Sequence, residues 1–277
     1  MVIDARKKNG FFSGPEPRLF AHRGASALAP ENTIESFRLA RNAGAPYLEL
    51  DVHLSADGHV IVIHDNSVSR TTGRRGRVEK MTLTEIRRLD GGHEFTLDRG
   101  RSYPYRGKGL VIPTLEEVLR EFPDARLTIE IKKTRKGIGA SVLEVIRRCQ
   151  ASERVLVASH EHQHLKEFRS LDGDVPTSFS KTEVREFLAW LRGGAADGYR
   201  APGEALQVPE YFGLRRVTSV NFIEAAHRLD LEVHVWTVNE PVHIKRLLRW
   251  GVDGIMTDDP ARAVASVVEL ADVGGKD

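Results

Sequence analysis

Cysteine is scarce in this sequence and long apolar runs are missing, and each absence excludes a class of protein. Cys149 is the single cysteine in 277 residues, which excludes an intrachain disulfide and a metal site built from several cysteines. No apolar run approaches the roughly 18 residues that a membrane-spanning helix requires. The first 17 residues contain charges but lack the apolar core of a secretory signal. We therefore expect a cytoplasmic protein without a transmembrane segment.

The composition is that of a folded, water-soluble chain. Apolar residues make up 40% and charged residues 29% of the sequence, which excludes a disordered or collagen-like protein. The length fits one large domain, such as an α/β barrel of about 250 residues, as well as it fits two smaller domains.

Charge is unevenly distributed along the chain. The formal net charge is only +2, but residues 66–109 hold eleven basic and five acidic side chains, which gives this segment +6 and the remainder −4. A basic segment of this size attracts anions such as nucleic acid, a phosphorylated metabolite or an anionic membrane surface. Most of these side chains, taken singly, are more typical of a solvated protein face than of an anion-binding site.

Short apolar runs alternate with amphipathic segments along most of the chain. Residues 33–43, 138–148 and 242–250 show apolar side chains at helical spacing. Asn32 is placed to cap the first of these helices, with Glu35 as the reciprocal partner, and Pro260 is placed to begin a last helix. The runs that we expect to form strands are 19–22, 47–52, 60–64, 127–131, 155–159, 175–178, 206–208, 233–238 and 254–257.

Strands that alternate with helices predict a parallel sheet with helical crossovers. About eight such units, with no glycine-rich nucleotide turn after the first strand, favour a closed TIM-type (β/α)8 barrel over an open doubly wound sheet. Residues 66–110 interrupt the alternation, and we interpret them as an insertion after the second or third strand that stands over the active-site end. The expected organisation is an N-terminal extension, 1–17, followed by a single barrel domain, 18–277.

Residues 47–54 alternate strictly between apolar and polar side chains. Glu49 and Asp51 therefore project from one face of the predicted strand, toward the barrel interior. Two enclosed carboxylates repel each other unless a cation or a proton accompanies them, and oxygen ligands suit Mg²⁺ or Ca²⁺. A second alternating strand adds Glu130 as a third oxygen ligand and Lys132, on the same face, as a cation for an anionic substrate.

Histidines end two of the predicted strands. His22 and His64 would lie at the carboxyl ends of barrel strands, where barrel enzymes build their active sites. An imidazole has an unperturbed pKa of about 6.5, so the two could act as general acid and general base. Arg23 supplies a fork that fits phosphate. Trp236 ends another strand, where it could belong to the core or to the wall of a pocket.

Three alternating histidines, His160, His162 and His164, invite a zinc interpretation. The segment follows a predicted strand and leads into an apolar helical stripe, which indicates the start of a helix. Side chains two residues apart on a helix do not face each other. We therefore expect a helix start and no zinc site here.

Taken together, these residues resemble the glycerophosphodiester phosphodiesterase family over roughly Arg18 to Arg262. The resemblance implies a TIM barrel that binds one divalent cation, Mg²⁺ or Ca²⁺, and that carries an insertion after its His-Asp motif. One departure is His160, which stands where many members have Phe. The matching motifs are HRG (22–24), PENT (30–33), ELDV (49–52), HD (64–65), RTTG (70–73), EIK (130–132), WTVN (236–239) and GVDG (251–254).

The resemblance also implies a role for each matching side chain. The expected partner is a small-molecule glycerophosphodiester and not nucleic acid, while peripheral membrane contact and the oligomeric state stay open. The implied metal ligands are Glu49, Asp51 and Glu130, the acid–base pair is His22 and His64, the phosphate-binding cations are Arg23 and Lys132, and Trp236 flanks the substrate.

Three functions fit this set of residues. The first is hydrolysis of a glycerophosphodiester to an alcohol and sn-glycerol 3-phosphate, and the second is a lysophospholipase D activity with the same site. The third is a non-catalytic, anion-binding barrel, which the intact histidines and acids disfavour. The nucleophile stays open between water and the substrate's own 2-hydroxyl, which would give a cyclic phosphate first.

Overall fold

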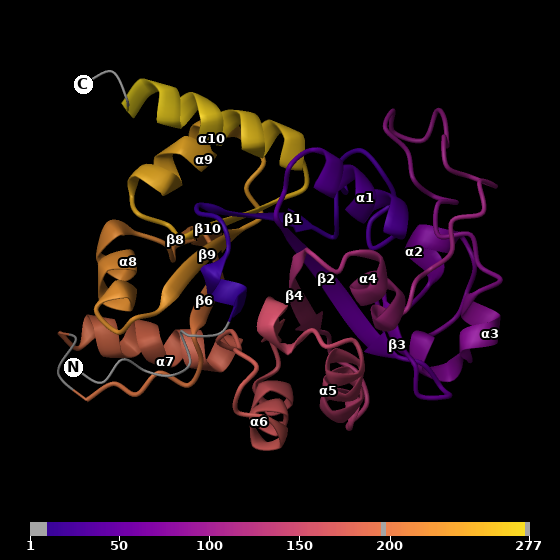
Figure 1. The fold of residues 1–277 in the computed structure, drawn as a ribbon, viewed down its shortest axis with the longest axis horizontal. Coiled ribbons are helices and arrows are strands. Elements are labelled where there is room, and N and C mark those ends of the chain that lie inside the picture. The colour runs from indigo at the N-terminus through magenta and orange to yellow at the C-terminus, as the bar shows by residue number, and fades with distance from the viewer. Residues whose placement is uncertain (1–9, 195–197, 275–277) are drawn as a thin grey trace.

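Strands and helices alternate along the described chain, which comprises residues 10–194 and 198–274 of a computed structural model (Figure 1). The strands are β1 (Arg18–His22), β2 (Tyr47–Leu54), β3 (Val60–Val62), β4 (Arg126–Ile131), β5 (Val155–Ala158), β6 (Ala205–Pro209), β7 (Tyr211–Phe212), β8 (Arg215–Arg216), β9 (Glu232–Trp236) and β10 (Gly254–Thr257). The α-helices are α1 (Ile34–Asn42), α2 (Ser69–Thr72), α3 (Leu83–Ile86), α4 (Leu115–Glu121), α5 (Ile138–Arg148), α6 (His162–Leu171), α7 (Lys181–Arg192), α8 (Val220–His227), α9 (Pro241–Arg249) and α10 (Pro260–Gly274). Short 3-10 turns form η2 (Gly10–Ser13), η3 (Val78–Lys80) and η4 (Ser152–Arg154).

A closed ring of parallel strands lies at the centre of the molecule. Neighbouring strands follow the order β5, β4, β2, β1, β10, β9, β6, and each of these pairs is parallel. Residues 177 and 178 complete the ring, because Thr177 pairs with Val157 of β5 and Ser178 pairs with Ala205 of β6, both in parallel. The predicted TIM barrel is confirmed, with the predicted strand 175–178 reduced to these two bridges.

The prediction that residues 60–64 form a strand of the barrel was wrong. β3 pairs antiparallel with the end of β2, with Val62 opposite Val52 and Val60 opposite Leu54, so it is the return arm of a hairpin. The Ile63 amide donates to the Asp51 carbonyl at 2.9 Å. His64 therefore reaches the mouth of the barrel because the hairpin folds back along β2, and not because it ends a parallel strand.

Apolar side chains of the strands are buried under the helices, as their alternation predicts. Leu48, Leu50 and Val52 of β2 are inaccessible to solvent and belong to one core with Phe37 of α1 and Val142 of α5. Each side chain of this kind contributes about 1.5–3 kcal/mol on burial. The apolar face of β2 thus packs outward, and the acidic face is left for the interior of the ring.

The amino-terminal end of the ring is closed by aromatic side chains and an ion pair. Phe11 of η2 packs edge-on against Tyr47, with ring centroids 5.5 Å apart. Arg18, with a side chain only 1% exposed, lies 2.6 Å from Glu232. This plug leaves the opposite, carboxyl end of the strands as the open end of the barrel. Residues 1–9 of the predicted N-terminal extension lie outside the described residues.

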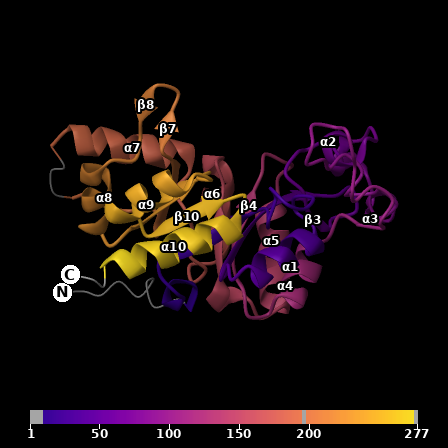
Figure 2. The ribbon, with the colours of Figure 1, turned by 90° about the horizontal axis from the view of Figure 1, so that it is seen from above.

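Residues 66–110 follow β3 and hold α2, η3 and α3. Val68, Val78 and Ile86 of this segment form a small buried core with Ile61 and Ile63. Figure 2 shows α2 and α3 at the right of the view, next to β3, and the β7–β8 hairpin at the upper left. The segment therefore packs on the β2–β3 hairpin, beside the strand that carries the paired acids.

Candidate active site

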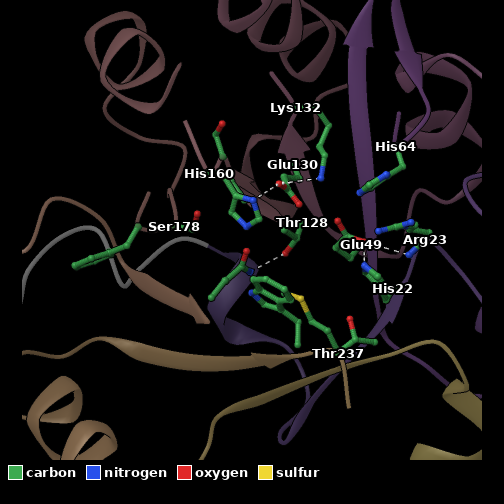
Figure 3. A pocket seen from close by; sticks show the side chains of 16 residues that line it. His22, Arg23, Glu49, His64, Thr128, Glu130, Lys132, His160, Ser178 and Thr237 are labelled. Atoms are coloured by element: carbon green, nitrogen blue, oxygen red, sulfur yellow. Dashed lines mark hydrogen bonds and ion pairs between the residues drawn. The ribbon is translucent and has the colours of Figure 1, made fainter. Parts of the chain in front are cut away.

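Three carboxylates from two neighbouring strands meet at the open end of the barrel, and Figure 3 shows two of them, Glu49 and Glu130. β2 and β4 pair in a register that sets Asp51 opposite Glu130, and Glu49 shares a face of β2 with Asp51. Oxygen atoms of the three side chains lie within 4.8 Å of one another. Glu49 is 3% exposed and Asp51 is fully buried. The structure thus brings together the three acids selected from the sequence.

The charges of these acids are only partly balanced. Burial and the charge of Asp51 raise the pKa of Glu49 to about 8. Burial also opposes ionisation of Asp51, but Lys132 and Arg23 outweigh it and hold its pKa below the usual range. Lys132 Nζ lies 3.2 Å from both Asp51 Oδ1 and Glu130 Oε1, and Arg23 Nε lies 3.2 Å from Asp51 Oδ2. A buried set of hard oxygen ligands with excess negative charge fits a divalent cation.

His22, the last residue of β1, is oriented by a carboxylate from the opposite end of the sequence. Its Nδ1 lies 2.7 Å from Asp258 Oδ1. Burial opposes ionisation of Asp258, yet hydrogen bonds from His22 and Asn239 lower its pKa to about 2, so the carboxylate accepts and Nδ1 carries the proton. Burial by itself would lower the pKa of His22, but Asp258 and Glu49 outweigh it and raise that pKa. The other ring nitrogen of His22, Nε2, lies 3.9 Å from Glu49 Oε2.

His64 has the same arrangement on the other side of the acids. Its Nδ1 lies 2.7 Å from Asp65 Oδ1, as the adjacency of the two residues in the sequence suggests. Arg70 of α2 donates to Asp65 Oδ2 at 2.6 Å and also to Glu31. Burial raises the pKa of Asp65, but Arg70 and His64 outweigh that effect and lower it. Two imidazoles, each held through Nδ1, therefore face one group of acids, as Figure 3 shows for His22 and His64.

Asn32 differs from its predicted role. It does not cap α1, because the cap is Thr33, whose hydroxyl accepts from the Ser36 amide at 3.2 Å. Asn32 instead adopts a left-handed backbone with a φ of 56°, which Asn tolerates better than most residues. From there its amide donates to Asp51 Oδ2 at 2.9 Å. The residue therefore holds a site carboxylate and not a helix end.

Asp258 was missed in the sequence, and Asn239 was named there only within the WTVN motif, without a role. Asn239 Nδ2 donates to Asp258 Oδ2 at 2.8 Å, which fixes the carboxylate that orients His22. Asp258 directly follows β10, and Asn239 lies three residues after the end of β9. Carboxyl ends of barrel strands carry active-site residues, so the argument applied to His22 could have found Asp258 as well.

The far wall of the pocket is formed by Trp236, His160 and Gln207, and the cavity has a volume of about 130 Å³. The Trp236 and His160 rings lie 5.5 Å apart and are inclined by 35°. Burial lowers the pKa of His160, which keeps the ring neutral. Gln207 Nε2 donates to Thr128 Oγ1 at 3.2 Å. Trp236 lines this pocket and also packs against a buried core cluster, so both of its sequence interpretations apply.

The histidine series 160–164 is divided between different environments. α6 begins at His162, which confirms the predicted helix start. His160 lines the pocket, whereas His164 is a buried residue of α6 and is not among the residues that line the pocket. Among residues 10–194 and 198–274, the acids Glu49, Asp51 and Glu130 form the group with metal-ligand spacing.

Known proteins share this sequence pattern and fold over nearly the whole chain. Residues 22–262 match the model of the glycerophosphoryl diester phosphodiesterase family. The chain belongs to this family. The family predicted from the sequence motifs is thereby confirmed. Within the described ranges, every helix is too short or too polar to cross a membrane.

Two relatives and one solved structure illustrate the similarity. The chain is 35% identical over 254 residues to a glycerophosphodiester phosphodiesterase of Bacillus altitudinis, covering 89% of this chain and 96% of that protein. It is 32% identical over 262 residues to one of Caldanaerobacter subterraneus subsp. tengcongensis, with 93% and 98% covered. A phosphodiesterase of Oleispira antarctica, solved in complex with the product sn-glycerol-3-phosphate, matches with a TM-score of 0.74 at 25% identity, over 91% of this chain and 97% of that one.

Proposed function

We propose that the protein hydrolyses glycerophosphodiesters to an alcohol and sn-glycerol 3-phosphate, using one divalent cation and two histidines. The observation that carries the proposal is the meeting of His22 and His64, each oriented by a carboxylate, at one group of three acids. The names of the relatives and the product bound to the Oleispira antarctica enzyme support the same reaction.

Glu49, Asp51 and Glu130 would hold the cation. Their carboxylate oxygens are hard ligands of the kind that Mg²⁺ and Ca²⁺ prefer, and their clustering calls for positive charge. When bound, a divalent cation would offset the negative charge that develops on the phosphoryl oxygens. Asn32 would keep Asp51 in place through its 2.9 Å hydrogen bond.

Arg23 and Lys132 would bind the phosphate group. Both side chains are largely buried beside the acids, and the positive charge of each lies 3.2 Å from an oxygen of Asp51. Arg23 is also held by Glu31, at 3.2 Å from its Oε1, which limits the guanidinium to one orientation. Positioned cations of this kind favour a transition state with more negative charge than the bound diester.

The two histidines would transfer protons. With Nδ1 bonded to Asp258 or Asp65, each imidazole has only Nε2 to exchange a proton with the substrate. One would take the proton of the attacking hydroxyl, and the other would give a proton to the departing alcohol. The attacking hydroxyl would belong either to water or to the glycerol 2-position.

The pocket favours a small organic group over an acyl chain. Its lining is mostly polar and charged, with Arg23, Glu130 and Lys132 among the lining residues, and such a lining suits the hydroxyls of a three-carbon polyol better than an apolar chain. Trp236, which lines the cavity, would flank this group. This observation supports a small diester over the lysophospholipid alternative.

The test is release of sn-glycerol 3-phosphate from glycerophosphoethanolamine, glycerophosphocholine and glycerophosphoglycerol, each with Mg²⁺, Ca²⁺ or EDTA. We expect turnover that EDTA abolishes and that excess divalent cation restores. Lysophosphatidylcholine, assayed in parallel for choline, tests the lysophospholipase D activity. Choline release without turnover of the small diesters would replace the proposed substrate class, and no turnover of any substrate would contradict the proposal.

A further inference from the structure

A groove opens beside the active-site pocket and shares two side chains with it. His64 and Lys132 line both cavities, and the groove has a volume of about 550 Å³. One wall comes from residues 65–79, at the start of the basic segment, and the other from the loop between β4 and α5. The two cavities therefore meet at a histidine and a lysine that the proposed function assigns to phosphate chemistry.

Positive charge in this groove is not fully compensated. Lys133 and Arg135 line it and are exposed, and within the described ranges neither lies in an ion pair. Arg135 donates only a long bond, 3.5 Å, to the Ala56 carbonyl. Arg77 has its own partner in Glu79 at 2.7 Å. Two cations thus remain available to an anion that enters beside His64 and Lys132.

Unsatisfied polar atoms also occur on the residues that line the groove. Among the described residues, His53 Nδ1, Asn66 Oδ1 and Thr134 Oγ1 are buried and have no hydrogen-bond partner. The other ring nitrogen of His53, Nε2, donates a hydrogen bond to the His64 carbonyl at 3.0 Å. Buried polar atoms in native proteins nearly always have partners. Of these three atoms, the Thr134 hydroxyl can donate to an anion, whereas His53 Nδ1 and Asn66 Oδ1 are acceptors.

We infer that this groove binds a second phosphate, carried by the alcohol of the diester. A phosphodiester has two organic groups on one phosphorus, and here two cavities diverge from one pair of side chains. One organic group can occupy the pocket beside Trp236 while the other extends between Asn66 and the 133–135 loop. The inference rests on the proposed function, and it narrows the substrate class to diesters whose alcohol carries a phosphate monoester.

The test compares glycerophosphoglycerol with its derivative that carries a phosphate monoester on one of its two glycerol groups. Loss of the diester signal in ³¹P NMR follows both substrates in the same way. We expect kcat/KM to be roughly tenfold higher for the phosphorylated diester, since two exposed ion pairs each contribute up to about fivefold. The preference should lie in KM and decrease with added salt, because salt screens exposed charges.

Two variants separate the groove from general charge effects. The double variant Lys133→Ala/Arg135→Ala should lose most of the preference, whereas Lys166→Ala, an exposed lysine on α6, should keep it. Equal kcat/KM for both diesters in the wild type, or a preference that survives in the double variant, would overturn the inference and leave the proposed function standing. No turnover of either diester would overturn both.

Discussion

Replacing Glu232 by Gln should destabilise the protein by about 3 kcal/mol at pH 7. Glu232 lies at the closed end of the barrel, where its Oε1 and Oε2 accept from Arg18 at 2.6 Å each. It also bonds to His234 at 3.0 Å. Gln keeps the size of the side chain but leaves the Arg18 guanidinium, 1% exposed, without its main counter-charge. Removing one partner of a buried ion pair leaves the other charge buried and unpaired.

The magnitude follows from the pKa of the carboxyl. Burial would raise it, but Arg18 and His234 outweigh burial and lower the pKa of Glu232 from 4.5 to about 2. At about 1.4 kcal/mol for each tenfold change in proton affinity, this corresponds to roughly 3 kcal/mol. Because the pKa is depressed in the folded state, the contribution is complete above about pH 4.5 and disappears as the pH falls through about 2. At pH 3 about half of it should remain.

Urea unfolding of the wild type and of Glu232→Gln at pH 7 and pH 3 measures both values. In thermal scans the variant should melt about 6–12 °C lower at pH 7. Glu144→Gln is the matched control, since Glu144 is 74% exposed and pairs with Arg148 at 3.0 Å, and it should change the free energy of unfolding by less than about 1 kcal/mol. A loss below about 1 kcal/mol in Glu232→Gln, or one that does not shrink at pH 3, would refute the reasoning.

The other predictions concern the site. His22→Ala and His64→Ala should each lower kcat by at least about 10²-fold, measured on glycerophosphoglycerol, and near-normal turnover of both variants would remove the acid–base assignment. Asp258→Asn keeps the shape of the side chain but weakens its hold on His22 Nδ1, so kcat should fall by roughly 10-fold or more with little change in KM; a change confined to KM would contradict this positioning role. Mg²⁺ or Ca²⁺ at about 100 times its Kd should stabilise the wild type by about 2.7 kcal/mol. Glu49→Gln should lose most of that gain in a thermal shift assay, and an equal gain in both proteins would exclude Glu49 as a ligand.

The sequence by itself determined the features that depend on neighbouring residues. Glu49 and Asp51 share a face because side chains alternate in any strand, and their shared face points inward because the other face is apolar. The same local rule placed Glu130 and Lys132 together, and α5 was predicted at its observed limits from apolar spacing alone. The barrel followed from the alternation of such elements, although residues 60–64 form no barrel strand and residues 175–178 contribute only two bridges.

Only the tertiary structure decided which distant groups meet. Asp258 reaches His22 across 236 positions in the chain because β1 and β10 are neighbours once the ring closes. The side-chain amide of Asn32 bonds to Asp51 and not to the backbone amides of α1, because the left-handed backbone at Asn32 directs this side chain inward. The groove exists because a loop after β4 passes beside the segment after β3. No local periodicity encodes these meetings, because they arise from closure of the sheet.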